Sequence, residues 1–318
     1  MKTPKYFQNQ NALSKLLSPI GAIYAAITAL RLKTTKPYQS RLPVVCIGNI
    51  LAGGVGKTPV SIAIAKLLIK SGKNPFFISR GYGGKLSGVL VDITAHTPRD
   101  VGDEPLILAR TAPTVVCKDR AKAAKIAEEN GADILIMDDG FQNPSLKKDV
   151  SFLVFSGETG IGNGKILPAG PLRESLKSGL KRANGVFIVE KDKTNLLEKI
   201  DKPCFEVYIK EEKPQSIASK ILAFAGIGYP IKFYNSLMKC GLTIAKTYDF
   251  EDHHFYARAE LEALIDEARQ KDLALFTTMK DFVKIPTDLQ PHFNVLNINA
   301  EIKNEKALLD FLANKGIC

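Results

Sequence analysis

Residues 44–70 place a buried strand, a glycine-rich loop and a helix in direct succession. Residues 44–47 are apolar throughout, as in a strand that is covered on both faces. In such a loop, glycines let several backbone N–H groups converge on a polyphosphate, a lysine contacts the outer phosphates, and a hydroxyl completes a Mg²⁺ shell. The segment therefore predicts a phosphate-binding loop made of Gly53, Gly54, Val55, Gly56, Lys57 and Thr58, with Lys57 and Thr58 in the last two roles.

Two residues beside this loop bear on the prediction. Pro59 suits the first helical turn, where no N–H is needed. The usual spacing, however, asks for glycine at position 51, where the chain has Leu51. A glycine-rich turn without a ligand therefore stays open as the alternative.

Apolar strand patterns alternate with helical ones along most of the 318 residues, which predicts a parallel sheet with helical crossovers. A change of texture near residue 204 indicates a domain junction. We expect an α/β fold of the P-loop type, with a doubly wound, mostly parallel sheet, a second and smaller α/β domain, and an N-terminal membrane-associated helix. The expected division is an N-terminal segment 1–36, a nucleotide-binding domain 37–203, a linker 204–220 and a C-terminal domain 221–318.

The N-terminal part is strongly basic and contains an apolar run at residues 16–30. The first 91 residues carry 13 lysines and arginines and no acid, so an anionic partner should meet this part of the chain. The run is shorter than the roughly 20 residues that span a bilayer, and basic residues flank both of its ends. This predicts a helix on an anionic membrane surface rather than a spanning helix or a secretory signal, although packing on the protein's own core stays open.

The remaining composition narrows the partners and the compartment. No basic-aromatic interleaving accompanies the positive charge, so we expect no nucleic-acid partner. The five cysteines form no C-x-x-C pair, which fits a reducing compartment and offers no metal framework. We expect a monomer.

Four groups of acids and bases could carry chemistry. Asp138 and Asp139 directly follow the expected strand 134–137, at the edge where the phosphate loop would hold Mg²⁺, so both are candidate metal ligands; an acidic capping turn is the alternative. Asp103, beside Glu104 at an expected helix start, is a candidate base for an attacking hydroxyl, with helix capping as the alternative.

A further pair and a histidine motif complete the set. Arg173 could neutralise a transferring phosphate, and Glu174 could join the metal shell or orient the arginine; a surface ion pair is the alternative. Asp252-His253-His254 could tune a base across the cleft between the domains, or form only a polar turn.

Taken in order, these motifs resemble the tetraacyldisaccharide 4'-kinase family over nearly the whole chain. The matching segments are Gly48-Asn49 with residues 53–59, residues 79–83 (SRGYG), 102–105 (GDEP), 138–142 (DDGFQ), 167–174 (LPAGPLRE), 224–228 (FAGIG) and 250–254 (FEDHH). The sequence departs from the family pattern at Asn143, where histidine is usual, and at Met279, which interrupts T-E-K-D.

The resemblance implies transfer of the γ-phosphate of ATP, with Mg²⁺, to the 4'-hydroxyl of an acylated disaccharide lipid, tetraacyldisaccharide 1-phosphate, forming lipid IVA in lipid A biosynthesis. It also implies the cytoplasmic face of the bacterial inner membrane, an acyl-chain-binding N-terminal helix, and Asp103 as a base paired with His253, with neighbouring His254 still open. The rival hypothesis is a membrane-associated switch ATPase with a deviant phosphate loop. Ala52 argues against it, because such proteins carry a lysine just before the glycine pair.

Overall fold

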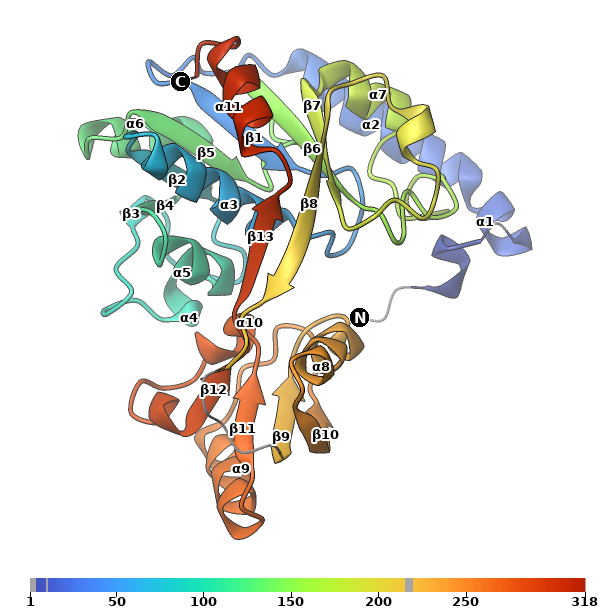
Figure 1. Ribbon diagram of the computed structural model, residues 1–318. Coiled ribbons are helices and arrows are strands. Elements are labelled where there is room, and N and C mark those ends of the chain that lie inside the picture. Colours follow the sequence, from blue (N-terminus) through green and yellow to red (C-terminus); the bar gives the residue numbers. More distant parts are fainter. Residues whose placement is uncertain (1–3, 10, 215–219, 318) are drawn as a thin grey trace.

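The computed structural model describes residues 4–9, 11–214 and 220–317, which form two lobes joined by extended chain (Figure 1). The large lobe is built on a nine-stranded sheet and the small one on a four-stranded sheet. Residues 215–219, part of the expected linker, lie outside the described residues. The expectation of a mostly parallel α/β sheet with a second, smaller α/β domain is confirmed.

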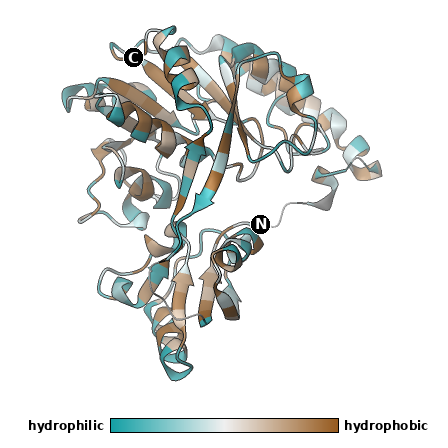
Figure 2. Cartoon of the chain, in the orientation of Figure 1, coloured by the Kyte–Doolittle hydropathy of each residue, from teal (hydrophilic) through white to brown (hydrophobic). Residues whose placement is uncertain are grey.

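The large sheet has the order β13-β8-β7-β6-β1-β5-β2-β4-β3 and is parallel except at its two edge strands, β3 and β13. Its central strands are buried along their whole length, in line with the apolar runs in the sequence (Figure 2). The strands are β1 (Val44–Gly48), β2 (Pro75–Ser79), β3 (Val89–Leu90), β4 (Thr114–Val116), β5 (Ile134–Asp138), β6 (Val150–Ser156), β7 (Gly185–Val189), β8 (Cys204–Glu211) and β13 (Ile298–Ile302).

Helices connect these strands and cover the sheet. Asp119 caps α6 by accepting from the backbone of Ala121, and Ser175 caps α7 by accepting from Ser178. The helices are α3 (Lys57–Lys70), α4 (Pro98–Val101), α5 (Asp103–Ala109), α6 (Arg120–Glu129), α7 (Leu176–Arg182) and α11 (Glu305–Ala313), with the short 3-10 helix η2 (Leu197–Lys199).

The register of the central strands determines where the site residues lie. Ile47 in β1 is paired with Asp138 in β5, so the phosphate loop after β1 and the acids after β5 emerge side by side. The order reverses at β1, because the chain continues to β5 and β2 on one side and to β6 and β7 on the other. Ligands of open α/β sheets bind at such a switch point.

The small lobe holds a sheet of order β10-β9-β11-β12 in which all pairs are parallel. Its strands are β9 (Lys220–Ala225), β10 (Thr243–Asp249), β11 (Ala274–Thr277) and β12 (Phe293–Val295), and its helices are α8 (Pro230–Lys239), α9 (Arg258–Gln270), α10 (Met279–Phe282) and η3 (Gln290–His292). Its core is separate from that of the large lobe and includes Phe224 and Leu264 on one face and Phe233 and Phe276 on the other.

The structure corrects the expected domain boundaries on both sides of the small lobe. Residues 204–211, expected in a linker, form β8, which pairs with β7 in the large sheet. Residues 298–317, expected in the C-terminal domain, return to the large lobe, where β13 pairs with β8 and Leu308 and Leu312 join the main core. In β8, apolar and polar residues alternate, because this strand lies near the edge of the sheet and only one of its faces is turned to the core. This alternation differs from the apolar runs of the central strands, and the sequence therefore suggested a linker.

The N-terminal segment forms η1 (Lys5–Phe7), α1 (Ala12–Leu16) and α2 (Ser18–Thr34) along the outside of the large lobe (Figure 1). In α2 only Gly21 is buried, and the helix lies so close to the large lobe there that a Cβ would meet the carbonyl oxygen of Ile166 at 2.9 Å. The alternative, a helix packed on the protein's own core, therefore holds only near Gly21, because the large apolar side chains of α2 are exposed. Within the described residues, no helix is long and apolar enough to cross a membrane.

Candidate active site

The glycine-rich loop forms an open turn that ends at the start of α3. Gly53 has φ 125° and Gly56 has φ 90°, values that residues other than glycine rarely adopt, and Gly56 is the N-cap of α3. A Cβ on Gly53 or Gly54 would meet nothing within 4 Å, so the loop is open on the side to which these side chains would point. The loop therefore has the open helix N-terminus that polyphosphate binding requires.

The structure explains why position 51 is leucine. Leu51 is buried and forms an antiparallel bridge with Leu172, while the backbone N–H of Ala52 donates to the carbonyl of Pro171 at 2.8 Å. The strand-like pairing leaves no need for a left-handed residue at this position. The segment 167–174 thus braces the first half of the phosphate loop.

Asp138 is a buried carboxylate without a cationic partner among the described residues. Its Oδ1 accepts from the hydroxyl of Ser61 at 2.7 Å, and its Oδ2 lies 3.3 Å from Oγ1 of Thr58. Burial, together with the nearby negative charge of Glu104, raises the pKa of Asp138 to about 6. A divalent cation beside Thr58 would relieve this uncompensated charge.

Asp139 faces the phosphate loop from the other side. It has φ 52°, in the left-handed region, and its Oδ1 lies 3.7 Å from Nζ of Lys57 and 3.8 Å from Nη1 of Arg173. Such strained backbone is typical of functional loops. The acids, Lys57 and Arg173 therefore converge on one point.

These residues fit Mg²⁺ and nucleotide together rather than a metal cage. Within the described parts of the chain, no group of three or more His, Cys, Asp or Glu side chains is placed to hold an ion. Mg²⁺ usually takes one or two carboxylates and completes its shell with water and substrate phosphates. Asp138, Asp139 and Thr58 supply that donor set.

Glu174 is buried and bound by neighbouring side chains, rather than open to the phosphate loop as a metal ligand would be. Its carboxylate is almost fully buried and is engaged by Arg182, Ser178 and Gln142. Arg173 does not pair with Glu174, as a surface ion pair would demand, but turns toward Asp139 and toward Oε1 of Gln142 at 3.4 Å. Glu174 therefore anchors the loop that carries Arg173, and its role as a metal ligand stays a prediction.

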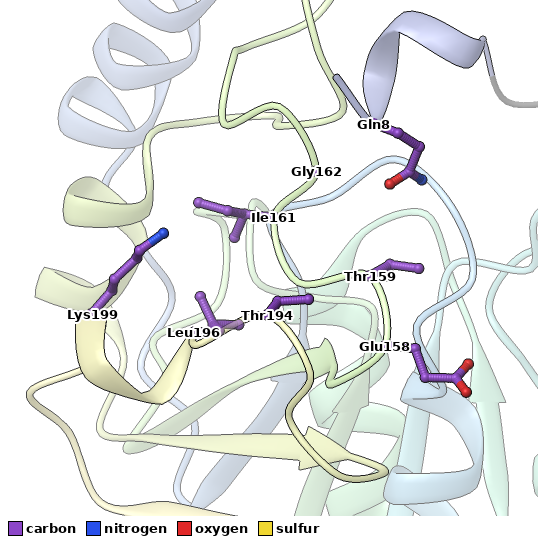
Figure 3. A pocket seen from close by; sticks show the side chains of 8 residues that line it. All are labelled: Gln8, Glu158, Thr159, Ile161, Gly162, Thr194, Leu196 and Lys199. Carbon is purple, nitrogen blue, oxygen red and sulfur yellow. The ribbon is translucent and has the colours of Figure 1, made fainter. Parts of the chain in front are cut away.

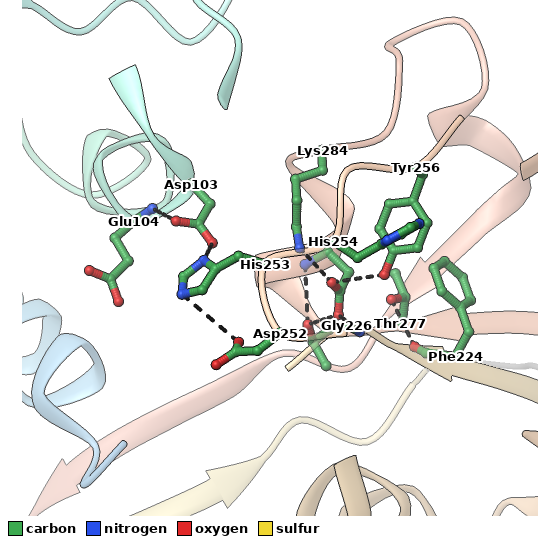
Figure 4. Close-up of polar contacts among 12 residues, drawn as sticks. Asp103, Glu104, Phe224, Gly226, Asp252, His253, His254, Tyr256, Thr277 and Lys284 are labelled. Atoms are coloured by element: carbon green, nitrogen blue, oxygen red, sulfur yellow. Dashed lines mark hydrogen bonds and ion pairs between the residues drawn. The ribbon is translucent and has the colours of Figure 1, made fainter. Parts of the chain in front are cut away.

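The candidate base and histidine meet across the two lobes (Figure 4). Oδ2 of Asp103, at the start of α5, lies 3.0 Å from Nδ1 of His253, which follows β10 in the small lobe. Burial alone would raise the pKa of Asp103, but the hydrogen bond with His253 and the charge of Lys280 outweigh it and hold that pKa below its usual value. The same hydrogen bond raises the pKa of His253. His254 instead contacts Glu260 at 3.1 Å and stacks on Phe250.

The loop before Asp103 is held by close backbone packing. Gly81 and Gly102 have φ 69° and 90°; a Cβ on Gly81 would meet a methyl of Val116 at 2.4 Å, and one on Gly102 would meet the carbonyl oxygen of Tyr82 at 2.6 Å. The segments 79–84 and 102–105 therefore form one unit. The N-cap of α5 is Gly102 rather than Asp103, although Oδ1 of Asp103 accepts from the first-turn N–H of Glu104 at 2.9 Å.

Two hollows lie near these elements. A cleft beside the Asp103–His253 contact is lined by aromatic rings of Tyr82 and Phe255. The larger hollow, of about 230 Å³, lies between Gln8 and the loops after β6 and β7, and it contains none of the candidate site residues (Figure 3). We assign the larger hollow no part in the chemistry.

Sequence reasoning missed several residues that support the site. Ser61 lies three positions after Thr58 in α3, a spacing that puts both hydroxyls on one helix face. Lys280 pairs with Glu104 at 2.9 Å across the lobes, and only the position of Met279 within a motif had drawn attention to this segment. Arg182 had no local signal, because its partner Glu174 lies in the preceding loop.

Comparison with known proteins identifies the family. The family model described as tetraacyldisaccharide-1-P 4'-kinase matches residues 13–316. The tetraacyldisaccharide 4'-kinases of Paramagnetospirillum magneticum and Rhodospirillum rubrum are 43% and 41% identical, over 95% and 94% of this chain and 94% and 93% of their own lengths. The chain belongs to the tetraacyldisaccharide 4'-kinase family.

A solved structure from the same family supports the fold. The kinase of Aquifex aeolicus, crystallised in complex with ATP, superposes with a TM-score of 0.79 at 26% identity, covering 95% of this chain and 99% of that one. Family membership makes this chain an ATP-dependent phosphotransferase of lipid A biosynthesis, acting on tetraacyldisaccharide 1-phosphate. The rival hypothesis of a switch ATPase is set aside.

Proposed function

We propose that this kinase transfers the γ-phosphate of ATP to the 4'-hydroxyl of its lipid substrate with Asp103 as the base and His253 as its partner. The observation that carries the proposal is the 3.0 Å contact between Asp103 and His253. The two residues come from different lobes, and only the docking of these lobes brings the carboxylate and the imidazole together. Asp103 stays ionised at neutral pH, as an acceptor of the hydroxyl proton must be. His253, with its raised pKa, can hold positive charge beside that carboxylate.

The phosphate loop supplies the other half of the site. Gly53, Gly54, Val55 and Gly56 present backbone N–H groups to the phosphates, and Lys57 reaches the outer ones. Thr58 and Asp138 would hold Mg²⁺, with Asp139 close by and Glu174 as a further candidate; when bound, the ion offsets negative charge on the transferring group. Arg173, close to Asp139, would stabilise charge on the same group.

We also propose that α2 lies on the cytoplasmic face of the bacterial inner membrane and contacts the acyl chains. Its large apolar side chains are exposed to more than half of their area at Ile20, Ile23, Ile27 and Leu30. Contiguous apolar exposure of this kind marks an interaction surface, and the flanking Arg31 and Lys33 suit anionic lipid. An Ile23→Glu, Ile27→Glu variant should lose co-sedimentation with anionic vesicles while retaining ATP binding.

The decisive assay follows ³²P from γ-labelled ATP into tetraacyldisaccharide 1-phosphate in detergent micelles with Mg²⁺. Wild type should yield a labelled bisphosphate lipid, and Asp103→Asn and Lys57→Ala should each reduce its formation by about a thousandfold. Equilibrium ATP binding separates the two variants, because Lys57→Ala should weaken it and Asp103→Asn should not. Full transfer by Asp103→Asn would refute the role of Asp103 as base.

A further inference from the structure

The helix α10 makes the contact between the lobes that lies next to the candidate base. Nζ of Lys280 in α10 lies 2.9 Å from Oε1 of Glu104 in α5, and both side chains are only about one-third exposed. Glu104 is the chain neighbour of Asp103, whose Oδ1 accepts from its N–H at 2.9 Å. Any shift of Glu104 therefore moves Asp103.

Apolar contacts on the same helix reinforce this ion pair. Val283, directly after α10, joins a buried cluster with Val101, Leu106 and Val116 of the large lobe. Met279 packs against that cluster, at the position where the family pattern has a glutamate. The contact of α10 with the large lobe thus combines the pair of Lys280 and Glu104 with an apolar patch, and the two together favour one docking orientation.

A chain of hydrogen bonds connects α10 to His253 inside the small lobe. Asp281, in α10, accepts from the backbone N–H of Gly226 at 3.0 Å. The carbonyl of Gly226 in turn accepts from the backbone N–H of His253 at 3.1 Å. His253 has φ 62°, in the left-handed region, so its backbone depends on such fixed partners (Figure 4).

We propose that Lys280 is a positioning residue, which docks α10 on α5 through Glu104 and thereby sets the contact between His253 and Asp103. Lys280 is joined to His253 through Asp281 and Gly226, and Glu104 is joined to Asp103 directly. The ion pair of Lys280 and Glu104 therefore sets the position of His253, in the small lobe, relative to Asp103, in the large one. This inference rests on the proposed role of Asp103 for its effect on activity, but not for its effect on geometry.

The sign of the change at His253 distinguishes positioning from plain electrostatics. The charged groups that face His253 are Asp103, Asp252 and Lys280, and the positive charge of Lys280 on its own lowers the pKa of His253. Removing that charge without movement would raise this pKa further. Losing the hydrogen bond with Asp103 would instead bring it down toward its ordinary value.

The test is a pH titration of the imidazole ¹⁵N signals of the full-length chain, comparing wild type with Lys280→Met and Lys280→Arg. We expect the His253 pKa to fall in Lys280→Met and to stay near the wild-type value in Lys280→Arg. Lipid phosphorylation should lose about tenfold in kcat in Lys280→Met, with ATP affinity unchanged and partial recovery in Lys280→Arg. Lys271→Met is the matched control, because Lys271, the C-cap residue of α9, pairs with Glu267 of that helix on the surface of the small lobe.

A double-mutant cycle with Glu104→Gln tests whether Lys280 acts through Glu104. The loss of kcat in the double variant should be no greater than in the single ones, because both substitutions remove the same contact. A His253 pKa that rises or stays unchanged in Lys280→Met, or fully additive losses, would overturn the inference. If Asp103→Asn retains activity while Lys280→Met still lowers the His253 pKa, the proposed base is wrong and the positioning role stands.

Discussion

Two buried aspartates occupy equivalent places in the two lobes and have opposite surroundings. Asp138 ends β5 in the large sheet, and Asp281 follows β11 in the small one, each at the carboxyl edge of parallel strands. Asp281 accepts from Gly226, Thr278, Tyr256 and Lys284 at 2.7 to 3.0 Å. Among the described residues, the carboxylate of Asp138 accepts hydrogen bonds only from the hydroxyls of Ser61, at 2.7 Å, and Thr58, at 3.3 Å.

The difference shows what separates a structural from a functional carboxylate at the same place in a fold. A buried charge with all of its partners holds the surrounding loops together, as Asp281 holds Gly226 and α10. A buried charge that lacks a cation is costly, so its place in the native state calls for another reason. For Asp138 we propose that this reason is a divalent cation, which the carboxylate would share with Thr58.

The largest expected effect is on Asp138→Asn, which should reduce lipid phosphorylation by about a thousandfold, because an amide is a poor Mg²⁺ ligand. Its stability should move the other way. The raised pKa of Asp138, about 6, means that its ionised form costs stability above that pH, so the variant should be at least as stable as wild type at pH 8 without Mg²⁺.

Thermal unfolding with and without Mg²⁺ and nucleotide checks this prediction. Both ligands together should raise the Tm of wild type and have little effect on Asp138→Asn, since stabilisation follows binding. A marked loss of stability in the variant at pH 8 would show that Asp138 is as structural as Asp281.

Lys284→Met should mainly reduce stability, whereas Asp138→Asn should mainly reduce activity. Lys284 and Asp281 are almost completely buried, so removing the lysine leaves an uncompensated carboxylate and should cost about 3 kcal/mol of unfolding free energy. Urea denaturation followed by circular dichroism measures this loss. Adding Asp281→Asn to the same chain should recover part of it, whereas the same added substitution would deepen the loss if the pair were not coupled.

The sequence predicted the large sheet well and its edge poorly. Strands such as β1, β2 and β5 are continuous apolar runs, which depend on burial alone and can be read locally. The return of β13 and α11 to the large lobe depends on pairing with β8 across almost 90 residues, and local pattern carries no information on such partners.

The candidate site likewise contains residues that could be predicted from the local sequence and residues that could not. Lys57, Thr58 and Asp138 are fixed by one strand register and could be placed from the sequence. The contact of Asp103 with His253 joins residues 150 positions apart, so only the family resemblance predicted it. The buried partners of Glu174 and the pairing of Lys280 with Glu104 followed from neither, because they depend on how loops and lobes dock.

The smallest expected effect concerns the pair Asp103 and His253, which lies between the two extremes of Asp138 and Asp281. The pKa of Asp103 is lowered, so its contribution to stability is present above its unfolded value and lost as pH falls through its folded one. The pKa of His253 is raised, so its contribution is present at low pH and lost as pH rises through its folded value. The pair therefore stabilises the chain only in the window between these two folded values.

Because His253 is partly exposed, the difference in unfolding free energy between wild type and His253→Gln should stay below about 1 kcal/mol. Urea denaturation near pH 6 and at pH 9 measures it, and the difference should shrink as pH rises, because the imidazole loses its positive charge. His292→Gln serves as the control, since that residue lies in η3, away from the contact between the lobes. A difference that is equally large at both pH values would mean that His253 contributes packing, as the residues around Asp281 do, rather than charge.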